Sequence, residues 1–142
     1  MVPGYYRRED ETRMTFEGGW LHTGDVVRED EEGFLYFVDR RKDMIKTGGE
    51  NVFAKEVEDA LLTHAKIQEV AVFGLPDRRW GEKIHAAVVL KPGEAATEEE
   101  ILAFARERLP GYKRPKVVYF LDELPRNPSG KVLKYKLREI QP

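Results

Sequence analysis

Residues 39–51 join two segments of different periodicity. Residues 34–38, Phe-Leu-Tyr-Phe-Val, have the residue types of a strand, whereas Val57, Ala60, Leu61 and His64 recur at helical spacing. Between them lie charged residues and the pair Gly48-Gly49, which permits backbone angles and close approaches that a side chain would forbid. On residue types alone the glycines indicate a tight turn, so the segment predicts a junction between a strand and a helix.

The sequence after this junction predicts a small domain of alternating elements. A helix is expected over residues 54–64, and residues 70–75 and 85–90 are apolar runs typical of two buried, antiparallel strands. Thr97 and Glu100 form a capping box that begins a second helix. A third strand over 116–121 and a closing helix over 132–140 complete an α+β fold with a small antiparallel three-stranded sheet.

The sequence before the junction predicts a β-hairpin. Residues 19–27 are expected to form a strand with a turn at Gly24, followed by an acidic turn over 28–33 and the strand at 34–38. Residues 1–15 are polar and show no period. At 142 residues, the chain has room for one core, or for a small domain with an attached piece of another.

Composition excludes several functions. Charged residues make up 35% of the chain and nearly cancel to a net charge of -2, so neither nucleic acid nor a membrane surface is an expected partner. No apolar run has the length of a membrane span. The absence of cysteine excludes disulfides and thiolate metal sites and fits a cytoplasmic protein; no metal site is predicted.

Three motifs occur in a characteristic order. They are Thr23-Gly24-Asp25, the segment Asp39-Arg40-x-Lys42-Asp43-x-Ile45-x-x-Gly48-Gly49-x-Asn51, and Asn127-Pro128-Ser129-Gly130-Lys131. Together they resemble motifs of the adenylate-forming acyl-CoA synthetases, of the fatty-acid–CoA ligase type. The resemblance runs over essentially the whole chain and implies the carboxy-terminal part of such an enzyme, without its large ATP- and acyl-binding domain.

The resemblance implies two domains and a hinge. Residues 1–41 would be the terminal strands of the amino-terminal domain, and residues 42–142 the mobile carboxy-terminal domain, with Lys42 as the pivot. An exposed charged residue between two domains can change its torsions with little steric resistance. The fragment is expected to be inactive without its own amino-terminal domain.

The resemblance also assigns residues to the first half-reaction. Asp25 would accept hydrogen bonds from the ribose hydroxyls of ATP, Arg40 would contact the same nucleotide, and Lys131 would be the catalytic lysine. A lysine at a loop tip is usually only solvated. In this family, however, it lies between the carboxylate and the α-phosphate, where it and Mg²⁺ relieve the repulsion between two anions.

A second set of residues is implied to meet CoA. Gly48 and Gly49 would leave room for the pantetheine arm beside Trp80, Tyr112 could stack on adenine, and Lys113 or Arg114 would face the phosphates. The reaction expected is carboxylic acid plus ATP and CoA giving acyl-CoA, AMP and pyrophosphate. Fatty or aromatic acids are the expected substrates.

Two other functions remain open. An adenylation domain that loads a carrier-protein pantetheine uses the same motifs, and the basic residues between Tyr112 and Lys116 favour free CoA over it only modestly. The chain could also be a non-catalytic CoA-binding module that docks on a separate subunit.

Overall fold

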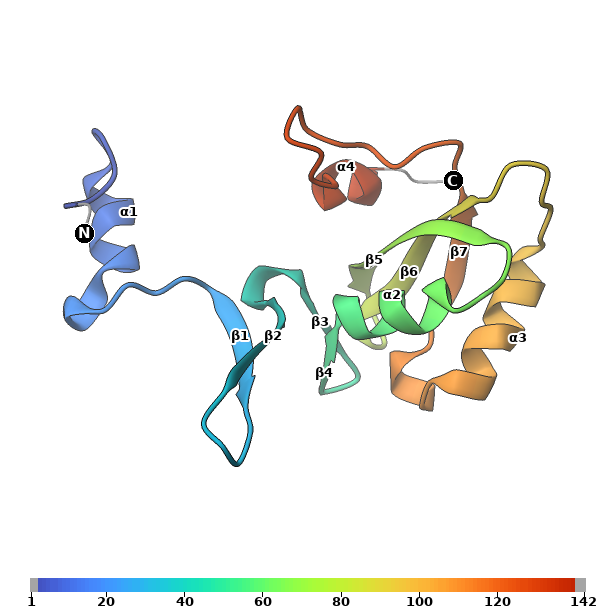
Figure 1. Cartoon of the computed structure of the whole chain (residues 1–142), viewed down its shortest axis with the longest axis horizontal. Coiled ribbons are helices and arrows are strands. Elements are labelled where there is room, and N and C mark those ends of the chain that lie inside the picture. Colours follow the sequence, from blue (N-terminus) through green and yellow to red (C-terminus); the bar gives the residue numbers. More distant parts are fainter. Residues whose placement is uncertain (1–2, 140–142) are drawn as a thin grey trace. The chain divides into compact units, whose positions relative to one another are not determined.

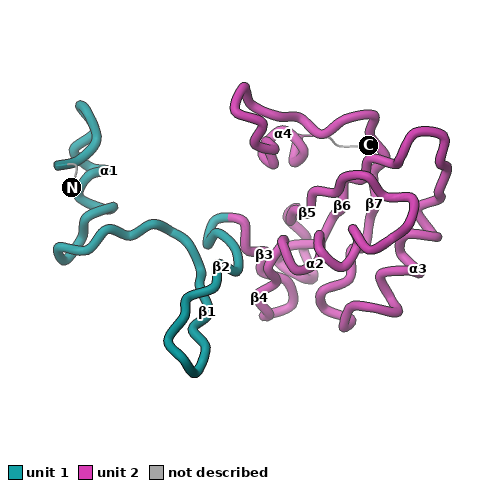
Figure 2. Tube along the Cα trace, in the orientation of Figure 1, with its two compact units in different colours: residues 1–42 teal, residues 43–142 magenta. Residues whose placement is uncertain are grey.

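The chain divides into two compact units. The computed structural model describes residues 3–139, and the units are Met1–Lys42 and Asp43–Pro142 (Figure 2). The division falls one residue from the boundary that the sequence predicts at residues 41 and 42.

The first unit contains a helix and a β-hairpin. Helix α1 (Glu9–Thr15) and the short turn η1 (Glu17–Gly19) precede strands β1 (Asp25–Glu29) and β2 (Leu35–Arg40), which pair antiparallel. The hairpin is as predicted, but β1 begins at residue 25 rather than 19, because Gly19 and Gly24 take positive φ angles of 82° and 74° that interrupt an extended strand. Helix α1 was not predicted; acidic residues fill its first turn, where the helix dipole favours them.

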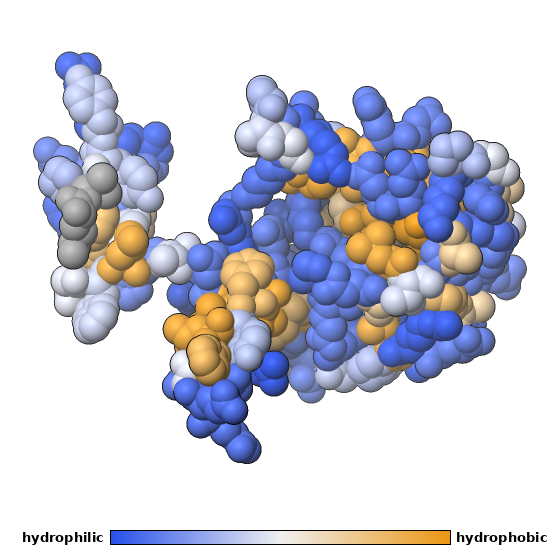
Figure 3. Space-filling model, in the orientation of Figure 1, coloured by the Kyte–Doolittle hydropathy of each residue, from blue (hydrophilic) through white to orange (hydrophobic). Residues whose placement is uncertain are grey.

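The first unit buries no apolar side chain among its described residues. All of the buried hydrophobic residues lie between Ile45 and Leu137. Figure 3 shows apolar side chains gathered on the hairpin, and those of residues 27 and 34–37 are each at least 47% exposed. The hairpin therefore presents to solvent the kind of surface that domains usually cover.

The second unit is built on a five-stranded sheet with β6 in the middle. Its strands are β3 (Met44–Thr47), β4 (Glu50–Phe53), β5 (Ile67–Asp77), β6 (Gly81–Leu90) and β7 (Val117–Phe120). Strand β5 pairs antiparallel with β6 along its length, from Ile67 opposite Leu90 to Asp77 opposite Gly81. On the other side of β6, β7 and the β3–β4 hairpin pair with different parts of it.

The sheet corrects the prediction of three antiparallel strands in two ways. Residues 44–53 form the hairpin β3–β4, with the predicted glycine turn at its tip. Strand β7 is parallel to β6, because α3 (Glu98–Arg108) crosses over the sheet between them and returns the chain to the starting end. The α+β class and the antiparallel β5–β6 pair are confirmed.

Helices cover both faces of this sheet (Figure 1). Helix α2 (Ala54–Leu62) and α3 pack on one face through a cluster that includes Val57, Ile101 and the strand residue Val72. The short α4 (Lys134–Glu139) and the segment before it pack on the other face, where Leu137 meets Phe73 and Ala71. Alternate residues of β5 thus enter two separate cores, which holds the strand in a single register.

Two glutamates cap the amides of the outer strands. Glu58 of α2 accepts a hydrogen bond from the Val72 N–H at 2.8 Å, and Glu98 of α3 accepts one from the Val118 N–H at 2.9 Å. Strands β5 and β7 each pair with β6 alone, so these amides would otherwise lack a strand partner. The helices are therefore fixed to the sheet by polar contacts as well as by apolar packing.

His85 makes the stability of this unit dependent on pH. The side chain is buried on β6, stacks on Phe73 and Tyr119, and lies 3.1 Å from the Tyr119 hydroxyl through Nδ1. Burial, and then the charge of Lys83, lower the pKa of His85 below its usual 6.5, while Asp77 opposes them weakly. Below pH 6.5 the unfolded chain therefore binds a proton that the folded chain does not, and stability falls.

We expect urea unfolding of the 142-residue chain to show this loss between about pH 7.5 and 5, and His85→Gln to show a smaller one. His22→Gln is the control, because His22 is exposed in the first unit. An unchanged pH dependence in His85→Gln would contradict the assignment.

Candidate functional site

A small cleft lies where the β3–β4 turn, the start of β6 and the turn before β7 meet. Its volume is about 170 Å³, and its lining residues are Thr47, Gly48, Trp80, Gly111, Tyr112 and Lys116. The structure thus brings together three of the residues predicted to meet CoA, from segments more than 30 positions apart in sequence.

Trp80 and Gly48 form one wall of this cleft. The Gly48 N–H donates to the Trp80 carbonyl at 2.8 Å, and Gly48 has a φ of +59°. A Cβ on Gly48 would lie 3.1 Å from Cε3 of the Trp80 ring. Asp77 Oδ1 holds the turn before Trp80 by accepting the Trp80 N–H, and its bonds to backbone amides and Lys83 lower its pKa. The indole ring therefore has a defined place above a residue without a side chain.

The cations near the cleft are not equivalent. Lys113 Nζ lies 2.5 Å from Glu56 Oε1, and this hydrogen bond raises the pKa of Lys113. Arg114 donates through Nε to the Leu109 carbonyl at 2.7 Å. Lys116 lines the cleft, and its contact with the Gly111 carbonyl is long, at 3.3 Å. Of these three, Lys116 is the cation most available to a ligand in the cleft.

The sequence prediction for this cleft was incomplete. Thr47 was given no role, and Gly111 and Lys116 belong to the predicted basic segment but were not assigned a contact with CoA. Gly49 has no atom within 4 Å of the position that its Cβ would take, and it does not line the cleft. Glu56 and Lys113 are 57 positions apart, so no local sequence pattern could have predicted their hydrogen bond.

Lys131 lies on a closed loop, residues 126–132, here named the lysine loop. Arg126 and Val132 form an isolated antiparallel bridge at its base. Asn127 closes the interior, because its side-chain oxygen accepts the Lys131 N–H at 2.8 Å and its own N–H donates to the Lys131 carbonyl at 2.9 Å. The exposed Lys131 side chain is thus carried opposite Asn127, on a loop whose backbone is internally bonded.

Asp25 and Arg40 meet in the first unit. They lie directly opposite each other in the β1–β2 register, and Arg40 Nε is 3.5 Å from Asp25 Oδ1. Lys42 is exposed in the short turn η2 (Arg41–Asp43), where the two units divide. The predicted nucleotide residues are therefore adjacent, and the predicted pivot lies at the division of the chain.

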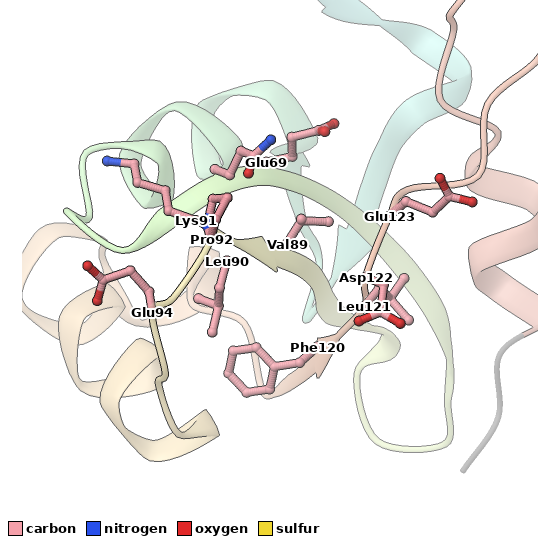
Figure 4. Close-up of a pocket in the computed structure, with 11 residues that line it drawn as sticks. Glu69, Val89, Leu90, Lys91, Pro92, Glu94, Phe120, Leu121, Asp122 and Glu123 are labelled. Atoms are coloured by element: carbon pink, nitrogen blue, oxygen red, sulfur yellow. The ribbon is translucent and has the colours of Figure 1, made fainter.

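A larger pocket of the second unit contains none of the predicted residues. It has a volume of about 610 Å³ at the end of β6 away from the cleft. Figure 4 shows the ring of Phe120 and the side chain of Leu90 between Glu94 on one side and Asp122 and Glu123 on the other. Among residues 3–139 there is no grouping of three or more metal-binding side chains, and no helix that could span a membrane.

Residues 56–131 match the sequence family described as AMP-binding enzyme C-terminal domain. A 2-succinylbenzoate–CoA ligase of Bacillus cereus is 53% identical over 137 residues, which are 96% of this chain and 28% of the relative. The structure is similar to that of o-succinylbenzoate CoA synthetase (MenE) from Bacillus subtilis, in complex with the acyl-adenylate intermediate OSB-AMP. That likeness has a TM-score of 0.88 and 42% identity over 97% of this chain and 28% of that one.

A Mycobacterium tuberculosis fatty acyl CoA synthetase is also similar, with a TM-score of 0.71 and 46% identity over 98% of this chain and 28% of that one. The chain therefore spans between a quarter and a third of the length of the proteins that it matches.

Gly48→Ala tests the contact between Gly48 and Trp80. A residue with a side chain costs about 1–2 kcal/mol in a left-handed conformation, and at Gly48 the new methyl group would also press on the indole ring. Gly49→Ala is the matched control, since Gly49 has a φ of +84° but open space around its Cβ position. Denaturant unfolding should show a larger loss of stability for Gly48→Ala, and Trp80→Ala should remove the difference. Equal losses in the native background would contradict this geometry.

Proposed function

Because the chain belongs to the AMP-binding enzyme C-terminal domain family, we propose that it is the carboxy-terminal part of an acid–CoA ligase that forms AMP. The observation that carries the proposal is the cleft, in which Gly48, Trp80 and Tyr112 come together beside an available cation, Lys116. An aromatic wall, a narrow space without a Cβ and a lysine suit a ligand with a thin arm and a phosphate-bearing head.

The exposed hairpin supports the proposal that residues 1–41 complete a larger amino-terminal domain. Its apolar side chains are exposed, and the chain spans only 28% of its curated relative. The remaining length can supply the surface that covers them. In this proposal residues 42–142 form the mobile domain, and Lys42 is the pivot between the two.

In the first half-reaction, a carboxylate oxygen of the acid attacks the α-phosphorus of ATP and pyrophosphate leaves. Lys131 would place its ammonium beside the reacting oxygens, where negative charge grows in the transition state. The Asp25 carboxylate would accept hydrogen bonds from the ribose, and Arg40, opposite it on the hairpin, would contact the nucleotide. Mg²⁺, held by the amino-terminal domain, would neutralise the leaving phosphates.

In the second half-reaction, the thiol of CoA attacks the acyl carbonyl and AMP leaves. The pantetheine arm would pass the Gly48–Trp80 wall, and Tyr112 would stack on adenine. Lys116 is the cation that lines the cleft, and its contact with the Gly111 carbonyl is long, at 3.3 Å. We therefore assign it to the CoA phosphates ahead of Lys113 and Arg114, which make shorter bonds to protein oxygens, at 2.5 and 2.7 Å. Gly49, with a φ of +84°, would allow the turn its left-handed backbone conformation.

The two sites lie at opposite ends of the sheet, which supports a change of orientation between the half-reactions. The lysine loop contacts the sheet through Arg126 and Glu69, near the start of β5. The cleft begins at Gly81, which pairs with Asp77, eight residues further along β5. At about 3.3 Å per residue, Glu69 and Asp77 are about 26 Å apart. A domain held in one orientation could not bring both the lysine loop and the cleft to the same acyl-adenylate.

Aromatic acids similar to 2-succinylbenzoate are the substrates that we propose first, since that acid names the curated relative. Fatty acids are the second candidate, because a fatty acyl CoA synthetase is similar over 98% of the chain. Two other functions are distinguished by an assay of thioester formation with free CoA. An adenylation domain that loads a carrier-protein pantetheine, or a module that binds CoA without catalysis, would not make free acyl-CoA in it.

Lys131→Ala in the full-length protein tests the proposal. Formation of acyl-adenylate should fall by a factor of about 10² to 10³, as is typical when one charge-stabilising contact is removed. Thioester formation from preformed acyl-adenylate and CoA should be unchanged, because the lysine acts only in the first step. Lys136→Ala is the control, since Lys136 is also an exposed lysine. Equal loss of both half-reactions would contradict the assigned role.

A further inference from the structure

Arg126 makes two contacts that connect the lysine loop to the sheet. Its guanidinium forms an ion pair with the carboxylate of Glu69 on β5. Nη1 of the same group donates to the carbonyl of Gly130 at 2.6 Å. One planar group therefore contacts both a rigid strand and the residue next to Lys131.

We propose that Arg126 and Glu69 are positioning residues for Lys131, an inference that rests on the proposed function. The lysine side chain is long and flexible, so the place of its ammonium depends on where its backbone is held. The hydrogen bonds of Asn127 hold the loop together, but they do not attach it to the rest of the domain. The Arg126–Glu69 ion pair attaches the loop to β5, and Val132 packs against the core that contains Phe73 and Leu137.

Arginine suits position 126 better than lysine would. Its fork of N–H groups can bind a carboxylate and a carbonyl at once, whereas a lysine at that place would have a single ammonium for both. Glu69 is held in turn by β5, where it pairs with Val89 near the end of β6. The positioning pair is therefore attached to a strand that is hydrogen-bonded to β6.

Because the Arg126–Glu69 ion pair is partly exposed to solvent, its positioning role can be tested separately from folding stability. The side chains of Arg126 and Glu69 are 44% and 31% exposed, and exposed ion pairs contribute little to folding. Variants of either residue should therefore fold normally. A displacement of a catalytic group by about 1 Å can nevertheless slow a reaction by as much as about 10²-fold.

The test measures both half-reactions in the full-length protein with Arg126→Ala, Arg126→Lys and Glu69→Gln. We expect kcat for acyl-adenylate formation to fall about 10-fold or more in Arg126→Ala and less in the other two, with KM for ATP little changed. Thioester formation from preformed acyl-adenylate should be unchanged. Arg106→Ala, an exposed arginine on α3, is the control.

Two further measurements make the outcome decisive. If Arg126 acts through Lys131, Arg126→Ala should cause no additional loss in a Lys131→Ala background. In the 142-residue chain, hydrogen exchange of the Lys131 amide should be faster in Arg126→Ala than in the native sequence or Arg106→Ala. A loss that is equal in both half-reactions, or that adds fully to Lys131→Ala, would overturn the positioning role.

The failure of this inference differs from that of the proposed function. If Lys131→Ala abolishes adenylation but Arg126→Ala does not slow it, only the positioning role is overturned. If Lys131→Ala leaves adenylation intact, the proposed function and the inference are both overturned.

Discussion

The antiparallel pairing of β5 with β6 is the interaction on which the rest of the second unit depends. It runs from Ile67 opposite Leu90 to Asp77 opposite Gly81, and its alternating side chains form both cores. A slip of one residue would exchange the two faces and leave α2, α3 and α4 without partners. The same pairing sets the distance between the lysine loop and the cleft, so register determines the geometry of both sites.

Much of the fold could be predicted because its signals are local. The apolar runs of β5 and β6 and the capping box of α3, where Thr97 accepts the Glu100 N–H, predicted elements that the structure contains. The β3–β4 hairpin could not be predicted, since its four-residue strands lie among charges and depend on distant partners. One is Glu82, which accepts the Lys46 N–H at 2.7 Å. The direction of β7 likewise follows from where α3 packs.

The site shows the same division between local and distant signals. The resemblance to the family predicted that Gly48, Trp80 and Tyr112 contact CoA, and these three residues converge in the cleft. The state of each cation could not be read from its neighbours in sequence, because Glu56 reaches Lys113 from 57 positions away. The partner of Arg126 is equally distant, at Glu69. Residue type therefore predicted which charges are present, and the tertiary structure determined which of them are available to a ligand.

The central claim is that one domain uses the two ends of its sheet in turn, by rotation about Lys42. It is tested most directly by a distance measurement between spin labels at Glu31→Cys and Ala103→Cys in the full-length protein. Both positions are exposed, residues 1–142 contain no cysteine, and any cysteine elsewhere in the full-length protein is first replaced with serine. The account predicts one distance distribution with ATP and acid and a different one with a stable acyl-adenylate analogue and CoA. A single distribution that no ligand changes would contradict it.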